Sequence, residues 1–140
     1  MKNALKIIKY YEGFSAEIYK CPAGLPTIGY GHVVLKNEKF ETPISKEFAE
    51  ELLISDCLKF QKQILRLIKI PLKTNQFEAL LSFTFNLGSG ALQRSTLRQK
   101  INRGEIISAA DEFLKWIYAG GRILKGLVLR RKAERELFIQ

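Results

Sequence analysis

The stretch EGFSAEIYKCPAGLPTIGYGH, residues 12–32, decides the fold of this chain, because the hydrophobic pattern changes here from helical to extended. Before it, Asn3 to Glu12 has the spacing of a short helix, and Gly13 stands where a glycine C-cap ends a helix. Within it, Ala16 to Lys20 and Thr27 to His32 favour β-strands, and Cys21-Pro22-Ala23-Gly24 suits a type I turn. The sequence therefore predicts a helix that leads directly into a small β-structure.

The second predicted strand carries two glycines on one face. In an extended segment, alternation directs Thr27 and the two glycines one way, and Ile28, Tyr30 and His32 the other. The glycine face can admit a close neighbour. His32 is the single histidine of the chain and lies opposite Thr27 in this pattern, so we expect a structural residue, hydrogen-bonded to an acid of the following helix, rather than a general base.

From residue 45 onward the hydrophobic period is helical. Ser45 is a candidate N-cap, with Glu47 in the first turn, for a long helix that runs toward Ile70 and ends before Pro71. Glycines mark the breaks between the helices that follow. Those helices are predicted at residues 74–86, 95–102, 105–118 and 127–138. The fold class is thus α+β and mainly helical.

Size and charge narrow the possible functions. The chain has 140 residues, which fits one domain or one compact body of two small lobes. Its net charge of +9 indicates an anionic partner such as nucleic acid, anionic lipid or bacterial wall. Two cysteines, Cys21 and Cys57, are too few for a disulfide framework and offer no metal-ligand spacing, so we expect neither a metal nor a cofactor. We see no signal peptide and no apolar run long enough to cross a membrane.

Three polar residues of the decisive stretch have a characteristic spacing. Glu12, Cys21 and Thr27 are separated by eight and by five residues. This pattern resembles the phage-type lysozymes, or endolysins, of glycoside hydrolase family 24, whose signature is Glu, eight residues, Asp or Cys, five residues, Thr. The likeness continues in order through residues 74–80, 83–88, 95–97, Trp116 and 119–121, and then through residues 126–135. It covers essentially the whole chain.

The resemblance implies a two-lobed, lysozyme-like fold over residues 1–140. A β-containing lobe of about residues 13–44 and a helical lobe of about residues 71–140 would be joined by a helix over about residues 45–70, with helix 3–12 leading into the active site. It also implies a muramidase that hydrolyses the β-1,4 bond between N-acetylmuramic acid and N-acetylglucosamine in peptidoglycan. Glu12, Cys21 and Thr27 would be catalytic. The family positions near the sugar are Val33, Phe85, Asn86 and Thr96.

The chemistry of glycoside hydrolysis agrees with these positions. It needs a protonated acid beside the leaving oxygen and a second group that organises water or stabilises oxocarbenium charge. A carboxyl group at a helix C-terminus faces the negative end of the helix dipole, which favours the protonated form of Glu12. The resemblance makes Thr27 the residue that holds water, Cys21 its base or electrostatic partner, and inversion of the anomeric carbon the usual outcome. Lys20 or an inward-turned arginine could stabilise a thiolate at Cys21.

Other features leave alternatives open. Trp116 and Cys57 are expected in the core, and Phe85 fits either core or sugar contact. Cationic residues recur along the predicted long helix as a solvated face or an anion-binding stripe: Lys59, Lys62, Arg66, Lys69 and Lys73. A second cluster contains Arg130, Arg131, Lys132 and Arg135; one arginine of the pair Arg130-Arg131 could turn toward Glu12. The rival functions are a helical nucleic-acid-binding protein and a cationic wall-binding protein with a decayed active site.

Our interpretation is a monomeric endolysin of phage or prophage origin that binds no nucleic acid. It would accumulate in the host bacterial cytoplasm and act on the cell wall after release by a holin-type membrane protein.

Overall fold

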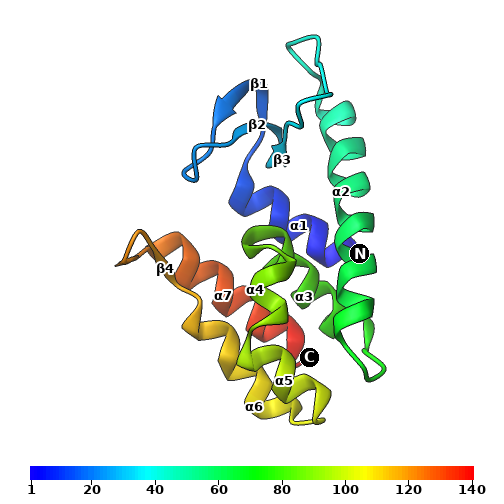
Figure 1. Cartoon of the computed structure of the whole chain (residues 1–140), viewed down its shortest axis with the longest axis vertical. Coiled ribbons are helices and arrows are strands. Elements are labelled where there is room, and N and C mark those ends of the chain that lie inside the picture. Colours follow the sequence, from blue (N-terminus) through cyan, green and yellow to red (C-terminus); the bar gives the residue numbers. More distant parts are fainter.

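The computed structural model describes all 140 residues, Met1–Gln140, as a helical body with a small sheet on one side (Figure 1). A three-stranded antiparallel sheet has the order β1-β2-β3, and β4 and β5 form a separate two-stranded hairpin. In chain order the elements are α1 (Lys2–Glu12), β1 (Ser15–Lys20), β2 (Pro26–Gly29), β3 (His32–Val33), α2 (Lys46–Leu67), α3 (Thr74–Leu87), α4 (Ser89–Gln93), α5 (Thr96–Asn102), α6 (Ile106–Glu112), η1 (Phe113–Lys115), β4 (Tyr118–Ala119), β5 (Arg122–Ile123) and α7 (Lys125–Phe138). None of the helices combines the length and the apolar character that a membrane span requires.

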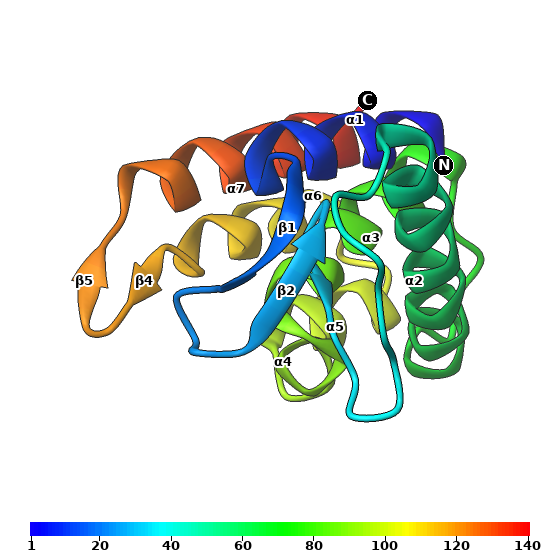
Figure 2. The ribbon, with the colours of Figure 1, turned by 90° about the horizontal axis from the view of Figure 1, so that it is seen from above.

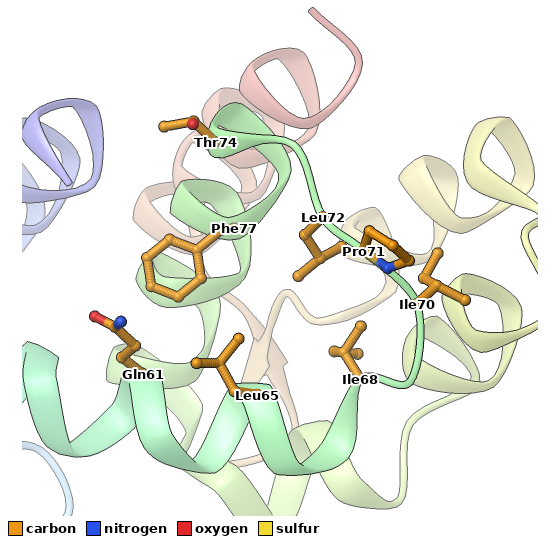
Figure 3. Close-up of a pocket in the computed structure, with 8 residues that line it drawn as sticks. All are labelled: Gln61, Leu65, Ile68, Ile70, Pro71, Leu72, Thr74 and Phe77. Carbon is orange, nitrogen blue, oxygen red and sulfur yellow. The ribbon is translucent and has the colours of Figure 1, made fainter.

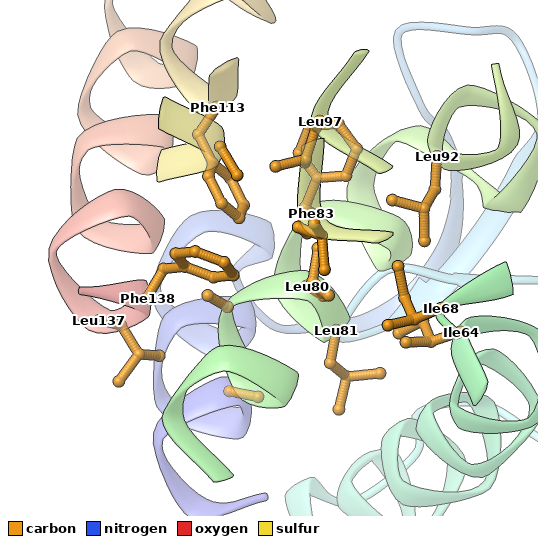
Figure 4. Packing of buried hydrophobic residues seen from close by; sticks show 14 of the residues in the cluster. Ile64, Ile68, Leu80, Leu81, Phe83, Leu92, Leu97, Phe113, Leu137 and Phe138 are labelled. Carbon is orange, nitrogen blue, oxygen red and sulfur yellow. The ribbon is translucent and has the colours of Figure 1, made fainter. Parts of the chain in front are cut away.

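Helix α3 lies at the centre of the helical body. It contacts α1, α2, α4 and α7, and its residues Ala79, Leu80, Leu81 and Phe83 have no solvent exposure. Phe83 packs edge-on against both Phe113 and Trp116, and Figure 4 shows Leu80, Leu97, Phe113 and Phe138 around it. Burial of each such side chain contributes about 1.5–3 kcal/mol. The core expectation for Trp116 is confirmed, because its partly buried ring packs on this cluster.

A second, smaller apolar cluster fixes the sheet on the first half of α2. Ile28, Ile44 and Ala49 are its buried members. Gly29, with a φ of 67°, makes the contact close: a Cβ at this glycine would lie 3.2 Å from the Cβ of Ala49. Together with the larger helical core, this cluster supports a proposal that the sheet and the helical body are two lobes joined by α2.

The helix expectations are confirmed at the strongest local signals. Ser45 caps α2 by accepting a hydrogen bond from the backbone N–H of Phe48 at 3.0 Å. Gly13 ends α1 with a φ of 72°. The Cys21-to-Gly24 turn is closed by a 2.8 Å bond from the N–H of Gly24 to the carbonyl of Cys21.

Three expectations about element boundaries are wrong. The predicted strand Thr27–His32 is broken by a turn at Tyr30 and Gly31, where the chain reverses into β3. The helix predicted at residues 105–118 ends at Glu112, passes through η1 and gives way to the β4–β5 hairpin, which projects from the end of the body opposite α2 (Figure 2). Helix α2 ends at Leu67, so Lys69 and Lys73 of the predicted stripe lie beyond it. The short helix α4 had no sequence prediction.

His32 ties the sheet to α2. Its Nδ1 lies 2.7 Å from Oδ2 of Asp56 on α2, and its Nε2 lies 3.0 Å from Oε1 of Glu38. The expected pairing with an acid of the long helix is confirmed. His32 is paired in register with Ile28, which puts both on one face, so its separation from Thr27 also holds, although the reason is the hairpin rather than one continuous strand.

The pairing of His32 with the carboxylates of Asp56 and Glu38 should stabilise the fold to an extent that depends on pH. The hydrogen bond to Asp56, and then that to Glu38, raise the pKa of His32 above its usual value, against the opposite effect of burial. A raised pKa means that the stabilisation is complete below about pH 6.5, the unfolded value, and is lost as pH rises through the folded value. We expect His32→Asn to lower the free energy of unfolding by about 1–3 kcal/mol at pH 5.5 and by less at pH 9. Equal losses at both pH values in urea titrations would contradict a charged imidazole.

Candidate active site

Glu12 occupies the last position of α1, and Arg130 of α7 holds its carboxylate. Oε2 of Glu12 accepts a hydrogen bond from Nη1 of Arg130 at 2.7 Å. The arginine side chain is 3% exposed and that of Glu12 is 21% exposed, so the carboxylate keeps an open edge while its partner is covered. Of the two candidate arginines, Arg130 is thus the one that faces Glu12.

The other side of the Glu12 carboxylate rests on Gly31. A Cβ at Gly31 would lie 2.9 Å from Oε1 of Glu12, and the backbone φ of 78° favours glycine in any case. The alternation of residues 27–32 predicts a glycine face that admits a close neighbour. At Gly31 the neighbour is the candidate catalytic acid, and at Gly29 it is α2.

Behind Arg130 lies a buried network of charges between α3 and α7. Arg130 donates from Nη2 to the carbonyl of Ser82 at 3.1 Å, and the Ser82 hydroxyl donates to Oε2 of Glu134 at 2.6 Å. Glu134 also pairs with Arg131, whose Nε lies 2.7 Å from Oε1. Burial raises the pKa of Glu134 and lowers the pKa of Arg131, and their mutual attraction opposes both shifts.

This network contains two members of the second cationic cluster, and it confirms that one arginine of the pair turns toward Glu12. Arg130 is 2% exposed and Arg131 is fully buried. Arg135 is paired with Asp111 at 2.9 Å. The sequence showed the charges but not their partners, since Ser82 and Glu12 lie 48 and 118 residues away from Arg130.

Cys21 and Thr27 lie at the end of β1 and on β2. The backbone N–H of Leu25 lowers the pKa of the Cys21 thiol, and partial burial opposes this. The expected cause, Lys20 or an arginine, is wrong, because the main contribution comes from a backbone N–H rather than from a cation. Thr27 is 2% exposed, and its hydroxyl donates to the carbonyl of Leu25 at 2.9 Å.

Tyr19 lies near enough to Glu12 and Cys21 for the charges of both to act on its hydroxyl. The sequence did not single out Tyr19 as a site residue. It is paired in register with Thr27 across β1 and β2. Burial raises the pKa of its hydroxyl, and the charges of Glu12 and Cys21 raise it further, so both groups act on Tyr19. A signal was available: Tyr19 stands two residues before Cys21, and residues two apart on a strand share a face.

The four expected sugar-contact residues have different surroundings. Val33 on β3 is paired in register with Thr27, and Thr96 is exposed at the start of α5. Asn86 accepts a hydrogen bond from Nη2 of Arg131 through Oδ1 at 2.9 Å, so one side of its amide belongs to the buried network. Phe85 packs edge-on against Phe60 of α2, with 5.7 Å between the ring centroids.

The remaining titratable residues form no second candidate active site or metal site. Cys57 is fully buried, and burial raises the pKa of its thiol to about 12, which fits the structural role expected for it. No three side chains of His, Cys, Asp or Glu gather as metal ligands.

Comparison with known proteins places the chain in a family. The model of the family described as phage lysozyme matches residues 9–134. The endolysin of Bacillus phage B103 is 42% identical over 96% of this chain, which spans 52% of that protein. The endolysin of Acyrthosiphon pisum secondary endosymbiont phage 1 is 40% identical over 98% of this chain and 95% of its own length.

Solved structures agree. An endolysin from Escherichia coli O157:H7 phage FAHEc1 superposes with a TM-score of 0.88 at 34% identity, covering 100% of this chain and 92% of that one. The muramidase domain of SpmX from Asticaccaulis excentricus also reaches 0.88, at 31% identity, covering 100% and 97%. The chain belongs to the phage lysozyme family, and with it to the glycoside hydrolases that cleave bacterial peptidoglycan as muramidases.

Because Gly31 contacts the Glu12 carboxylate, we expect Gly31→Ala to lower activity more than its effect on stability would explain. Gly31→Ala and Gly121→Ala both place alanine at a positive φ, 78° and 77°, which costs about 1–2 kcal/mol. Gly121 has open space around it, whereas at Gly31 the methyl group meets the Glu12 carboxylate. We expect similar losses of stability, but a fall in kcat on peptidoglycan of up to about a hundredfold for Gly31→Ala alone. Equal kcat values for the two variants would show that the contact does not position Glu12.

We predict that Cys21 takes part in the reaction as a thiolate. In a Cys57→Ala background, alkylation of Cys21 should inactivate the enzyme, and Cys21→Ala should lose most activity. Cys21→Asp should keep activity and extend the pH profile toward acid, because a carboxylate stays ionised down to about pH 4. Wild-type turnover and an unchanged pH profile in Cys21→Ala would leave Cys21 a structural residue. Cys57→Ala by itself should change only stability.

Proposed function

We propose that the chain is an endolysin in which Glu12 donates the proton that releases the leaving sugar, while Thr27 and Cys21 direct water to the anomeric carbon. The observation that carries the proposal is the placement of Glu12 between Arg130 and Gly31, with an open edge. A glycan that covers this edge excludes water from around the carboxyl group, so the proton can pass directly to the glycosidic oxygen. Arg130 then stabilises the carboxylate that remains after the proton has moved to the glycosidic oxygen.

The water is held on the strand side of the site. The Thr27 hydroxyl directs its hydrogen to the carbonyl of Leu25, so its oxygen presents lone pairs to a neighbour. A water molecule that donates one hydrogen to Thr27 and the other to the Cys21 thiolate keeps a lone pair for the anomeric carbon. As the new C–O bond forms and the glycosidic bond breaks, the thiolate accepts the second proton. Attack from the side opposite the leaving group inverts the anomeric configuration.

Sugar binding is proposed for Val33, Phe85, Asn86 and Thr96. Thr96 has a free hydroxyl at the surface, and the Asn86 amide nitrogen remains available because Arg131 engages only the oxygen. Phe85 and Val33 offer apolar contact to sugar rings. The rival functions receive no support from the family comparisons, which match lytic enzymes over nearly the whole chain.

The proposed acid predicts the effect of one substitution. Glu12→Gln keeps the shape and the acceptor for Arg130 but has no proton to donate, so peptidoglycan hydrolysis should fall by about 10²–10⁴-fold. Turbidity loss of purified cell walls measures the rate, and an unchanged circular dichroism spectrum shows that the variant folds. Retention of more than about a hundredth of the wild-type rate would count decisively against Glu12 as the acid.

We also propose that the enzyme accumulates in the host cytoplasm and reaches the wall when a holin-type protein permeabilises the membrane, and that it works as a monomer. Expression of the chain alone in a bacterium whose purified walls it hydrolyses should leave the culture density unchanged. Co-expression of a holin should then cause lysis, and the Glu12→Gln variant should not lyse under either condition. Lysis by the chain alone across an intact membrane would refute the release step.

A further inference from the structure

An apolar groove lies between the end of α2 and the start of α3, and it takes no part in the catalytic chemistry described above. Its volume is about 310 Å³, and Figure 3 shows Leu65, Ile68, Leu72 and Phe77 directed toward it. The full lining is Gln61, Leu65, Ile68, Ile70, Pro71, Leu72, Thr74 and Phe77. The end of α2 that carries it lies away from the β-sheet (Figure 1).

An exposed apolar row on α2 continues the groove. Leu58 is 49% exposed and Leu65 is 59% exposed, and the two are seven residues apart, which places them on the same side of the helix. Ile54, four residues before Leu58, is 38% exposed and extends the row by one turn. Single exposed apolar residues are ordinary, but a row that leads into an apolar groove is a contiguous surface.

Four exposed cations are chain neighbours of residues that line the groove. Lys62 follows Gln61, Arg66 follows Leu65, Lys69 stands between Ile68 and Ile70, and Lys73 stands between Leu72 and Thr74. All four side chains are exposed, and none forms an ion pair within the chain. Asp and Glu are absent from residues 57–77. We call this surface, formed by Leu58, Leu65, the groove and these four cations, the basic apolar face.

The charge of α2 is divided between its two halves. Glu47, Glu50, Glu51 and Asp56 stand in the first half, whereas Lys59, Lys62 and Arg66 stand in the second. The charge of Lys59 contributes to lowering the carboxyl pKa of Glu38, so it is partly compensated, unlike the charges of Lys62 and Arg66. Only the second half of α2 therefore presents an uncompensated positive surface.

We propose that the basic apolar face docks on a membrane surface rich in anionic lipid. Cations beside an exposed apolar row form the pattern of helices that lie in the lipid interface, with lysine and arginine at the headgroups and leucine among the upper acyl carbons. A hydrated polyanion such as a wall polymer would use the cations but would gain little from Leu58 and Leu65. A second copy of the chain would bring the same four cations face to face, which opposes self-association.

Docking through this face leaves the catalytic residues free. Glu12, Cys21 and Thr27 are absent from the groove lining, and the sheet packs against the first, acidic half of α2 rather than the half that carries the groove. The inference is therefore independent of the proposed catalytic roles, and the Glu12→Gln variant should bind membranes as the wild type does.

The test is sedimentation of the purified chain with vesicles of phosphatidylcholine that contain phosphatidylglycerol, compared with vesicles of phosphatidylcholine alone. Each cation near an anionic surface strengthens binding about fivefold, so the double substitution Lys62→Gln/Arg66→Gln should lower partitioning by about 25-fold. Lys36→Gln/Lys39→Gln removes the same charge from the loop after the sheet and should lower it by no more than a few-fold. Raising the salt concentration should weaken binding.

The apolar part is tested separately. Leu65→Ser should lower partitioning several-fold, whereas Ile107→Ser, at a site on α6 that is 76% exposed, should not. With Trp at the same positions, Leu65→Trp should show a blue shift on adding anionic vesicles and Ile107→Trp should not. All variants should keep their melting temperature and should hydrolyse membrane-free peptidoglycan at the wild-type rate.

Four results would overturn the proposal. They are equal binding to both kinds of vesicle, equal losses in the face and control variants, charge dependence without any effect of Leu65→Ser, and a dimer in sedimentation velocity that Leu65→Ser dissociates. The third result would show that the apolar row takes no part, as expected for a hydrated polyanion, and the fourth would indicate a second copy of the chain as the occupant.

Discussion

The ion pair between Arg130 and Glu12 is the contact on which the rest of the site depends. It joins the end of α1 to α7 across 118 residues of sequence, and it sets the direction in which the carboxylate points. A buried guanidinium loses its hydration, and this loss is offset only if every donor finds a partner. Ser82 on α3 and Glu134 on α7 supply these partners. The packing of α3 and α7 therefore determines where Arg130 lies, and Arg130 in turn positions Glu12.

The buried charges also explain why α3 must pack as it does. Ser82 has no solvent exposure and belongs to the same helix as Phe83, whose ring lies in the aromatic core. Arg131 lies over that ring, 5.2 Å from its centroid, and reaches Asn86 one turn further along α3. Removal of one partner from such a network typically costs about 3–5 kcal/mol, because a charge is left buried without compensation. The candidate site and the hydrophobic core therefore depend on the same packing of α3 against α7.

Local signals in the sequence predicted the parts of the fold that local physics determines. Ser45 could be identified as a cap, Gly13 as a helix end and residues 21–24 as a turn, because each conformation depends on a few neighbouring residues. The break at Gly31 could not be read from alternation, since a glycine in a strand pattern is compatible with either an extended or a left-handed backbone. The early end of α6 likewise depends on the β4–β5 hairpin, whose pairing is not visible in the helical period of residues 105–118.

The candidate site divides in the same way. The spacing of Glu12, Cys21 and Thr27 is a sequence pattern, whereas the choice of Arg130 over Arg131 and the influence on Tyr19 arise from tertiary contacts.

The role of Glu12 as the proton donor is tested most directly with an oligosaccharide substrate of the wall type that carries a dinitrophenyl leaving group. This group departs without protonation. If Glu12 is the acid, Glu12→Gln should cleave this substrate at a rate within about tenfold of the wild type while it hydrolyses peptidoglycan far more slowly. An equally strong loss on both substrates would contradict the role of Glu12 as the acid.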